Sequence, residues 1–446
     1  MQYDKIYRNL KLVQFLNELE KKYKIVDECN FFAELVNFSK NKDIPYHKWF
    51  KYREGYSHTL IQELLKRSKI SKNEYVMDPF CGSGTTVIEA NLGGFSGIGI
   101  DINPMSSFIS KIKCCSYTNE EIIKIESNID QLTSQNFNKP CDTSKYKAVE
   151  KFFPEENFIE LINIKNYFEQ FISEQKIYNF FRCAYICIVE PSSNRKRDGN
   201  GLKTIQSKVR SVKEFYILQC RNMLNDIKTN PIPNNVKSSI EFGSALDLYD
   251  IAINSKELQG LTAGAIMYSP PYPNSFDYFE SYKLEIIMAD YAKDLKDINK
   301  YRSSAVESFI GQQSEIKQSQ EFITSISEEI KNEIPIKEQR TAKKDCRTRR
   351  VPKMLIGYFA DMEKVIEQSG KLLPKNKYCY IVVDQSSYLG KIVPTDLLLA
   401  KISELYGFAV EEIIVCRKAR TSAQQAQLYP YLKDGLRESI VVLKKI

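Results

Sequence analysis

Histidine and tryptophan are scarce in this sequence of 446 residues, which has two histidines, His47 and His58, and one tryptophan. A histidine-rich zinc site therefore finds no support. A Ser-His-Asp triad finds none either, because both histidines precede the first sequence motif described below. The eleven cysteines are scattered without a CxxC pair, a pattern typical of reduced thiols in a cytoplasm. We expect no metal centre.

Long hydrophobic runs and a strong charge of one sign are also missing. No apolar run reaches the roughly 18 residues of a membrane span, and the first residues do not begin a secretory signal. We therefore expect a cytoplasmic protein without a membrane partner. The 64 Lys and Arg residues against 56 Asp and Glu residues give a net charge of +8, which permits a polyanionic partner but does not demand one.

The coarse pattern of the chain predicts one α/β domain that is interrupted twice. Its length fits two or three units, or one domain with large insertions. Residues 1–45 have apolar positions at helical spacing and are expected to form a helical lead-in. The α/β pattern is lost over residues 116–235 and 290–352, which we interpret as mainly helical insertions, the second highly charged. The α/β domain then consists of residues 46–115, 236–289 and 353–446.

The first motif is Asp78-Pro79-Phe80-Cys81-Gly82-Ser83-Gly84-Thr85-Thr86, between an expected strand and an expected helix. Glycine lets the backbone turn sharply and approach a ligand, and the helix start offers free N–H groups to an anion. Asp101, followed by Ile102, ends the next strand, where a carboxylate can bind ribose hydroxyls. These features indicate a nucleoside cofactor. A dinucleotide-binding fingerprint would need glycine where Val87 stands. The other alternative is a glycine turn that has a structural role and binds no ligand.

The second motif is Ser269-Pro270-Pro271-Tyr272, directly after an apolar run. An exocyclic amino group of a base is a poor nucleophile, because its lone pair is delocalised into the ring. The Ser269 hydroxyl and the Pro270 carbonyl can accept the amino hydrogens, and consecutive prolines stiffen the loop that aims them. Tyr272 can stack on a base swung out of a duplex. Alone, the motif would more often be a proline turn, but after the first motif we favour the functional interpretation.

The two motifs resemble motifs I and IV of the amino-methyltransferases of DNA, whose motif IV is N/D/S-P-P-Y/F/W. The resemblance covers roughly residues 46–112 and 240 to the C-terminus, with weaker matches at 47–57 (motif X), 101–104 (motif II) and 243–247 (motif III). It implies S-adenosyl-L-methionine as cofactor, bound by residues 78–86, Asp101, Ile102 and Asp247. It also implies a class I, Rossmann-like methyltransferase fold, with a mixed, mostly parallel sheet of seven strands.

Serine in the second motif bears on the product. Within the family, S-P-P-Y/F usually accompanies methylation of cytosine N4, whereas D-P-P or N-P-P accompanies adenine N6. We therefore expect a site-specific enzyme that methylates cytosine N4 in DNA after base flipping, with adenine N6 as the alternative. Cytosine C5 methylation is disfavoured, because it needs a cysteine nucleophile at this motif. Two further hypotheses are an RNA amino-methyltransferase and a catalytically silent nucleic-acid-binding homologue.

Two basic runs in the insertions are candidates for DNA contact. Residues 193–213 carry seven Lys or Arg and one Asp, and residues 341–353 carry six and one. Such runs can neutralise phosphates, although each could equally be a solvated surface. We assign target recognition to the first insertion, with help from the second. A cognate restriction endonuclease is a further possible partner, and the oligomeric state stays open. The candidate DNA-binding residues are Arg195, Lys196, Arg197, Lys203, Arg347, Arg349 and Arg350.

Overall fold

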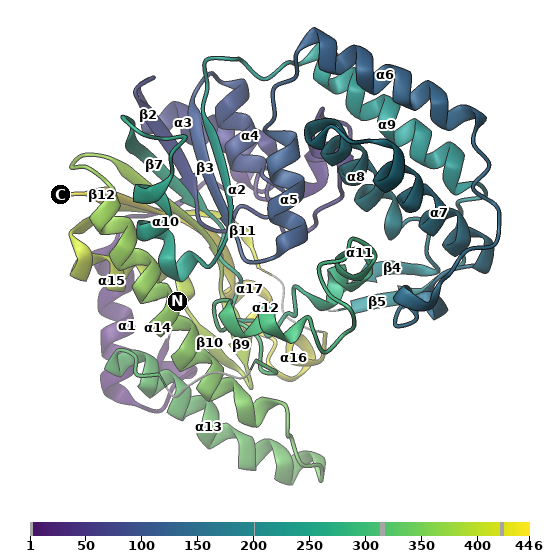
Figure 1. The fold of residues 1–446 in the computed structure, drawn as a ribbon. Coiled ribbons are helices and arrows are strands. Elements are labelled where there is room, and N and C mark those ends of the chain that lie inside the picture. The colour runs from purple at the N-terminus through teal and green to yellow at the C-terminus, as the bar shows by residue number, and fades with distance from the viewer. Residues whose placement is uncertain (1–2, 200, 313–316, 420–422) are drawn as a thin grey trace.

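An eight-stranded sheet runs through the molecule in the order β1-β11-β12-β8-β7-β2-β3-β6 (Figure 1). The computed structural model describes residues 3–199, 201–312, 317–419 and 423–446. The strands of the sheet are β1 (Ile25–Asp27), β2 (Glu74–Asp78), β3 (Ser96–Asp101), β6 (Ser238–Phe242), β7 (Thr262–Tyr268), β8 (Tyr378–Asp384), β11 (Phe408–Lys418) and β12 (Arg437–Lys445).

The pairing of these strands can be compared with the expected class I, Rossmann-like sheet. Neighbouring strands are parallel from β6 through β3, β2 and β7 to β8. Strand β12 lies between β8 and β11 and runs antiparallel to both. The expected mixed, mostly parallel sheet is thus confirmed, with one strand more than predicted. The eighth strand, β1, comes from the lead-in and pairs in parallel with β11, so residues 1–45 are not wholly helical.

Helices cover both faces of the sheet, because successive strand residues point to opposite sides. On β2, Val76 packs into one apolar cluster with α3 (His58–Ser68), whereas Met77 packs into another with α15 (Thr395–Ser403). Ile266 and Met267 on β7 divide in the same way. The core is therefore two apolar layers separated by the sheet. The other helices of this domain are α1 (Leu10–Lys22), α2 (Cys29–Phe32), α4 (Thr85–Leu92), α5 (Pro104–Lys113), α10 (Leu248–Asn254), α11 (Lys283–Met288), α14 (Val351–Leu372), α16 (Ala423–Leu428) and α17 (Leu432–Gly435).

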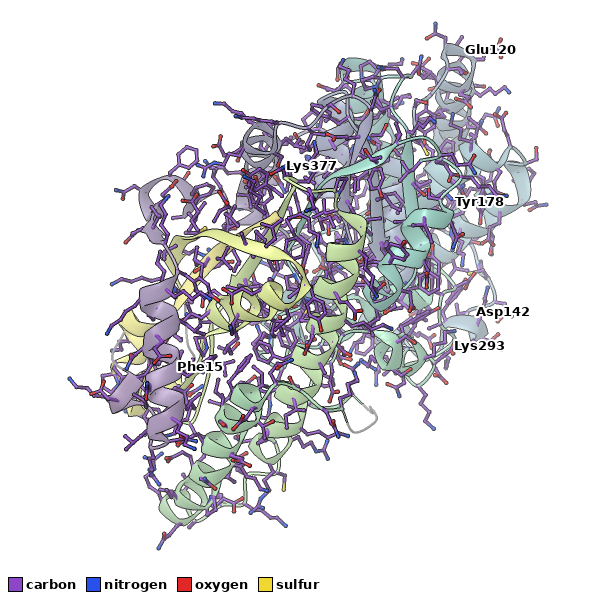
Figure 2. All side chains as sticks on the ribbon, turned by 90° about the vertical axis from the view of Figure 1, so that its left-hand side faces the viewer. Phe15, Glu120, Asp142, Tyr178, Lys293 and Lys377 are labelled. Atoms are coloured by element: carbon purple, nitrogen blue, oxygen red, sulfur yellow. The ribbon has the colours of Figure 1, made fainter. Side chains whose placement is uncertain are left out.

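The first insertion forms a helical lobe at the opposite end of the molecule from α1. Figure 2 shows Glu120 and Tyr178 of this lobe far from Phe15 of α1. A third apolar cluster joins the lobe to α4 and α5, so the lobe is packed onto the domain. It consists of α6 (Asn119–Ser134), α7 (Glu155–Phe171), α8 (Gln175–Val189), α9 (Val212–Thr229) and the antiparallel hairpin of β4 (Arg195–Asp198) and β5 (Gly201–Thr204).

The second insertion, residues 290–352, is highly charged. It contains α12 (Asn299–Ser304) and α13 (Glu321–Thr341), and α13 packs beside α14, which begins at the end of the insertion (Figure 1). Beside it lies a two-stranded ribbon of β9 (Ser386–Tyr388) and β10 (Lys391–Val393). Within the described ranges, no helix is long and apolar enough to cross a membrane.

The topology places a crevice at the ends of β2 and β7. From β2 the chain builds the sheet outward to β3 and β6, and then returns to build β7 and β8 on the other side of β2. In open α/β sheets, ligands bind at such a reversal of strand order, outside the carboxyl ends of the strands. Asp78 ends β2 and Tyr268 ends β7. Both sequence motifs therefore begin at this crevice.

Candidate active site

The turn after β2 needs glycine for two separate reasons. Gly82 and Gly84 have φ angles of 51° and 89°, a region that residues with a Cβ rarely adopt. A Cβ on Gly82 would also lie 2.6 Å from Cε1 of Tyr52, and one on Gly84 would lie 2.9 Å from Oγ of Ser110. The backbone turn is thus packed directly against neighbouring side chains, and it leads straight into α4.

Asp78 stabilises this turn through hydrogen bonds to its side-chain carboxylate. Its Oδ1 accepts the backbone N–H of Phe80 at 2.9 Å, and its Oδ2 accepts the hydroxyls of Tyr56 and Thr86 at 2.8 and 2.5 Å. The residue is only 1% exposed. Burial raises the pKa of Asp78 to about 6, while these hydrogen bonds act to lower it. Asp78 and Thr86 therefore hold the loop in shape.

Asp101 ties the ends of β2 and β3 together. Its Oδ2 accepts the N–H of Gly82 and its Oδ1 accepts the N–H of Asn103, both at 2.8 Å. Burial raises the pKa of Asp101 to about 6, against the lowering effect of the two backbone bonds. A carboxylate has about four acceptor positions, so each oxygen keeps capacity for a ribose hydroxyl.

The loop after β7 is held by tyrosine hydroxyls. Ser269 Oγ donates to the hydroxyl of Tyr272 at 3.2 Å, and that hydroxyl donates to Oε1 of Glu438 at 3.0 Å. The backbone N–H of Tyr272 donates to the hydroxyl of Tyr278 at 3.2 Å. The hydroxyl of Tyr388 donates to the carbonyl of Pro273 at 2.7 Å. The loop is therefore fixed at several points along its length.

One cavity of about 430 Å³ joins the two motifs, a size within the range of small-molecule sites, roughly 300–1,000 Å³. Of the predicted residues, those lining it are Asp78, Phe80, Cys81, Gly82, Ser83, Thr85, Asp101, Ile102, Ser269, Pro270, Pro271 and Tyr272. Pro79, Gly84 and Thr86 are buried behind the turn and do not line the cavity.

Asp247 lies away from this cavity. It ends a short 3-10 turn (Ala245–Asp247), its side chain is 60% exposed, and it faces Lys364 with 3.7 Å between Oδ1 and Nζ. It is absent from the cavity lining. The expected contact of Asp247 with the adenine of the cofactor is therefore not supported by its position, because the turn directs the carboxylate to solvent.

Other residues, which the sequence motifs did not single out, also line the cavity. Tyr52 stacks on Tyr282 with ring centroids 5.3 Å apart, and the segment 52–56 supplies one wall. Arg302 of α12 supplies part of another wall and forms an ion pair with Asp277 at 2.8 Å. The weak match at residues 47–57 was a signal for the first wall. No sequence signal pointed to the second, which comes from the charged insertion.

The predicted DNA-binding residues divide into exposed and internally bonded ones. Lys196 and Lys203 are exposed and face each other across the β4–β5 hairpin. Arg197, on the same hairpin, is only 4% exposed and forms an ion pair with Glu285. Its position therefore does not support the expected contact with DNA, because the guanidinium group is buried and paired inside the protein.

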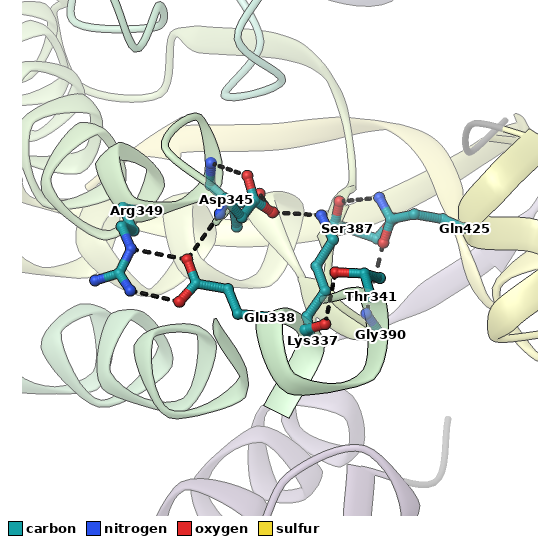
Figure 3. Close-up of polar contacts among 9 residues, drawn as sticks. Lys337, Glu338, Thr341, Asp345, Arg349, Ser387, Gly390 and Gln425 are labelled. Atoms are coloured by element: carbon teal, nitrogen blue, oxygen red, sulfur yellow. Dashed lines mark hydrogen bonds and ion pairs between the residues drawn. The ribbon is translucent and has the colours of Figure 1, made fainter. Parts of the chain in front are cut away.

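The remaining four arginines also differ. Arg195 is partly buried and bonds Thr204. Arg349 donates to both oxygens of Glu338, as Figure 3 shows. Arg347 and Arg350 are exposed. Only part of the charge in the two runs is therefore available to a polyanion.

Comparisons with known proteins agree with the two motifs. A family model described as "DNA methylase", of the N6/N4 type, matches residues 5–110. The type II methyltransferase M.BsoBI of Geobacillus stearothermophilus is 27% identical over 96% of this chain and 91% of its own. M.AvaI of Nostoc sp. (24%; 92% and 89%) and M.MvaI of Kocuria varians (23%; 90% and 89%), also type II methyltransferases, are similar as well.

The chain is thus similar to the amino-methyltransferases of DNA, by the family model over residues 5–110 and by its curated relatives over most of its length. A solved structure, the rRNA methyltransferase aviRa from Streptomyces viridochromogenes, covers 87% of this chain and 85% of its own at 8% identity, but its TM-score of 0.25 is too low to bear on the fold. The fold class rests instead on the strand order of this chain's own sheet.

The methyl donor of this family is S-adenosyl-L-methionine, and the residues of the cavity fit it. The N-terminus of α4 offers free N–H groups to a carboxylate, and Asp101 offers acceptors to ribose hydroxyls. Phe80 and Ile102 add apolar surface for the adenine ring. Among the residues that the structure describes, no three His, Cys, Asp or Glu side chains are grouped so as to hold a metal ion.

Proposed function

We propose that this protein transfers a methyl group from S-adenosyl-L-methionine to the exocyclic amino group of a base in DNA, and that the base is cytosine, methylated at N4. The observation that carries the proposal is the shared cavity onto which the glycine turn and the loop 269–272 both open. One side of this cavity suits the donor, and the other presents an amino-group acceptor. Their contiguity is what a direct transfer needs.

The side chains act by position and polarity. Bound S-adenosyl-L-methionine supplies an electrophilic methyl group on a sulfonium. Ser269 accepts a hydrogen from the target amino group and so favours the tetrahedral nitrogen that can attack. The prolines at 270 and 271 fix φ and keep the acceptor in place, because a fixed dipole costs no reorganisation during the reaction. The target base leaves the duplex stack to reach this buried position.

The preference for cytosine rests on Ser269 and on the correlation between motif and base within the family. Adenine N6 is the alternative product, since serine and aspartate can both accept an amino hydrogen. Both products share the fold, the cavity and the mechanism. The choice between them therefore needs a direct identification of the methylated nucleoside.

DNA is proposed to bind across the exposed basic side chains near the mouth of the cavity. The tip of the β4–β5 hairpin reaches the cavity lining at Gly199, and Lys196 and Lys203 stand side by side on the same hairpin. Two like charges directly opposite each other on a hairpin are unfavourable without a counter-charge. A DNA phosphate would supply it. Arg347 and Arg350, in the second insertion, are proposed as further phosphate contacts.

The similar proteins are named type II methyltransferases, which leads us to propose a role in restriction–modification, beside a cognate endonuclease. DNA modified by the protein should then resist one restriction activity from the same cell. DNA that stays fully sensitive to every such activity would contradict this role.

The proposed function is tested by incubating the protein with S-adenosyl-L-methionine carrying a labelled methyl group and either unmethylated DNA or RNA. We expect label in DNA. Ser269→Ala should lower the rate by about 100-fold or more, the scale of a lost group that stabilises the reacting atoms, with donor affinity near that of the wild type. Label in RNA alone, or full activity of Ser269→Ala, would contradict the proposal.

A further inference from the structure

A chain of hydrogen bonds leads from Ser269 to a buried carboxylate on the last strand. Ser269 Oγ donates to the hydroxyl of Tyr272, and that hydroxyl donates to Oε1 of Glu438 on β12. We propose that Glu438 is a positioning residue for methyl transfer: acting through Tyr272, it makes Ser269 a hydrogen-bond acceptor toward the target amino group and receives the proton that this group loses. The inference rests on the proposed function and deepens it.

The direction of these hydrogen bonds follows from the chemistry of Glu438, at which they end. An ionised carboxylate only accepts hydrogen bonds, so the hydroxyl of Tyr272 must donate to Glu438. The oxygen of Tyr272 is then the acceptor for the proton of Ser269. With its only proton committed to Tyr272, Ser269 can offer the substrate lone pairs alone. A serine without such a partner could rotate and donate instead, which would not hold an amino hydrogen.

A counter-charge lies beside Glu438. The residue is 3% exposed, and Arg417 of β11 donates to its other oxygen, Oε2. Burial raises the pKa of Glu438, and Arg417 acts to lower it. Asp384 is the direct neighbour of Glu438 on β8, and burial, followed by the charge of Glu438, raises the pKa of Asp384 to about 8. Arg417 pairs with Glu438, and it is this ion pair that favours the ionised form of Glu438.

The proton transfer balances. As the bond between the amino nitrogen and the methyl carbon forms, the methyl–sulfur bond breaks and its electron pair stays on sulfur. The amino nitrogen gives a proton to Ser269, whose own proton moves to Tyr272, whose proton moves to Glu438. The positive charge of the sulfonium and the negative charge of Glu438 disappear together. No oxidant, metal or further reactant is required.

A second cavity gives this proton a way out. It has a volume of about 200 Å³, shares Ser269 and Tyr272 with the first cavity, and is lined also by Arg417 and Glu438. Glu438 is absent from the lining of the first cavity. The protonated Glu438 thus borders a second space through which its proton can leave, and this would reset the enzyme for another turnover.

The test compares three variants of the full-length protein with the wild type in single-turnover methylation of unmethylated DNA. Glu438→Gln removes the charge at nearly constant shape, and Tyr272→Phe removes both hydrogen bonds but keeps the ring. Glu411→Gln, at an exposed position on the adjacent strand β11, is the matched control. Calorimetry measures donor affinity, melting temperature reports folding, and rates in H₂O and D₂O report proton transfer.

We expect Glu438→Gln and Tyr272→Phe each to lower the single-turnover rate about 100-fold, the lower range for general acid–base catalysis. Donor affinity should stay within about twofold, and the double variant should be no slower than either single one, because the groups act as a unit. The solvent isotope effect of the wild type should change in both single variants. Glu411→Gln should behave as the wild type.

Four outcomes would overturn the inference. They are a rate within threefold of the wild type for Glu438→Gln, full activity of Tyr272→Phe, losses that multiply in the double variant, and an isotope effect that neither variant alters. The first of these outcomes counts also for a Glu438→Gln protein that melts early, provided that the rate is measured below its melting temperature. A wild-type protein that methylates no base removes the proposed function, and this inference with it, whereas an active wild type with an active Glu438→Gln removes the inference alone.

Discussion

Gly82→Ala should weaken donor binding in a way that the structure makes quantitative. The left-handed backbone at Gly82, with φ of 51°, costs a residue with a Cβ about 1–2 kcal/mol. The added Cβ would also lie 2.6 Å from Cε1 of Tyr52, whose ring cannot retreat freely because it stacks on Tyr282. We expect the free turn of the variant to relax from this conformation and to return to it on binding, so that a cost of 1–2 kcal/mol lowers affinity by a factor of about 5–30.

Isothermal titration of S-adenosyl-L-methionine measures this loss, and Gly55→Ala is the matched control. Gly55 lines the same cavity, and a Cβ there would lie 3.6 Å from the ring of Tyr52, an ordinary contact distance. Its affinity should stay within about twofold of the wild type. Wild-type affinity in Gly82→Ala, or an equal loss in both variants, would refute the argument from backbone geometry.

Three further outcomes follow from charged groups. Because the pKa of Asp384 is raised to about 8 from roughly 4 in an unfolded chain, the folded state loses stability as pH rises between these values. Asp384→Asn should remove that loss. Its free energy of unfolding should therefore exceed that of the wild type by an amount that grows up to about pH 8 and then levels off. Parallel curves of unfolding free energy against pH for the two proteins would contradict this. Arg197→Ala should lower the free energy of unfolding by about 3–5 kcal/mol, because it leaves the buried Glu285 carboxylate without its partner. Urea unfolding like that of the wild type would contradict this prediction. Lys196→Ala and Lys203→Ala should each reduce the salt dependence of DNA binding by about one phosphate contact without changing stability; an unchanged slope would exclude the hairpin from the interface.

The strands that position the site were predictable from sequence, since their signal is local. Apolar runs ending at Asp78 and Tyr268 are followed by residues that fit only a few structures, a positive-φ turn in one case and a double proline in the other. The N-cap of α3 at Ser57 is local in the same sense, because its side chain accepts the N–H of Leu60 three residues later. Such features depend on neighbours in the chain.

What sequence reasoning missed depends on partners far along the chain. Strand β1 has only three residues and is defined by its pairing with β11. Arg197 alternates with Lys196 on a hairpin, and only the packing of Tyr282 and Glu285 against it decides which of the two is buried. Glu438 follows Tyr272 by more than a hundred residues, and the sheet order alone brings them together.

The most direct test of the central proposal is mass spectrometry of nucleosides from unmethylated DNA incubated with the protein and S-adenosyl-L-methionine. We expect N4-methylcytosine, formed by the wild type and lost in Ser269→Ala. N6-methyladenine would keep the cavity and the mechanism but overturn the choice of base. DNA of varied sequence that gains no methylated base would contradict the proposal that this cavity transfers methyl groups to DNA.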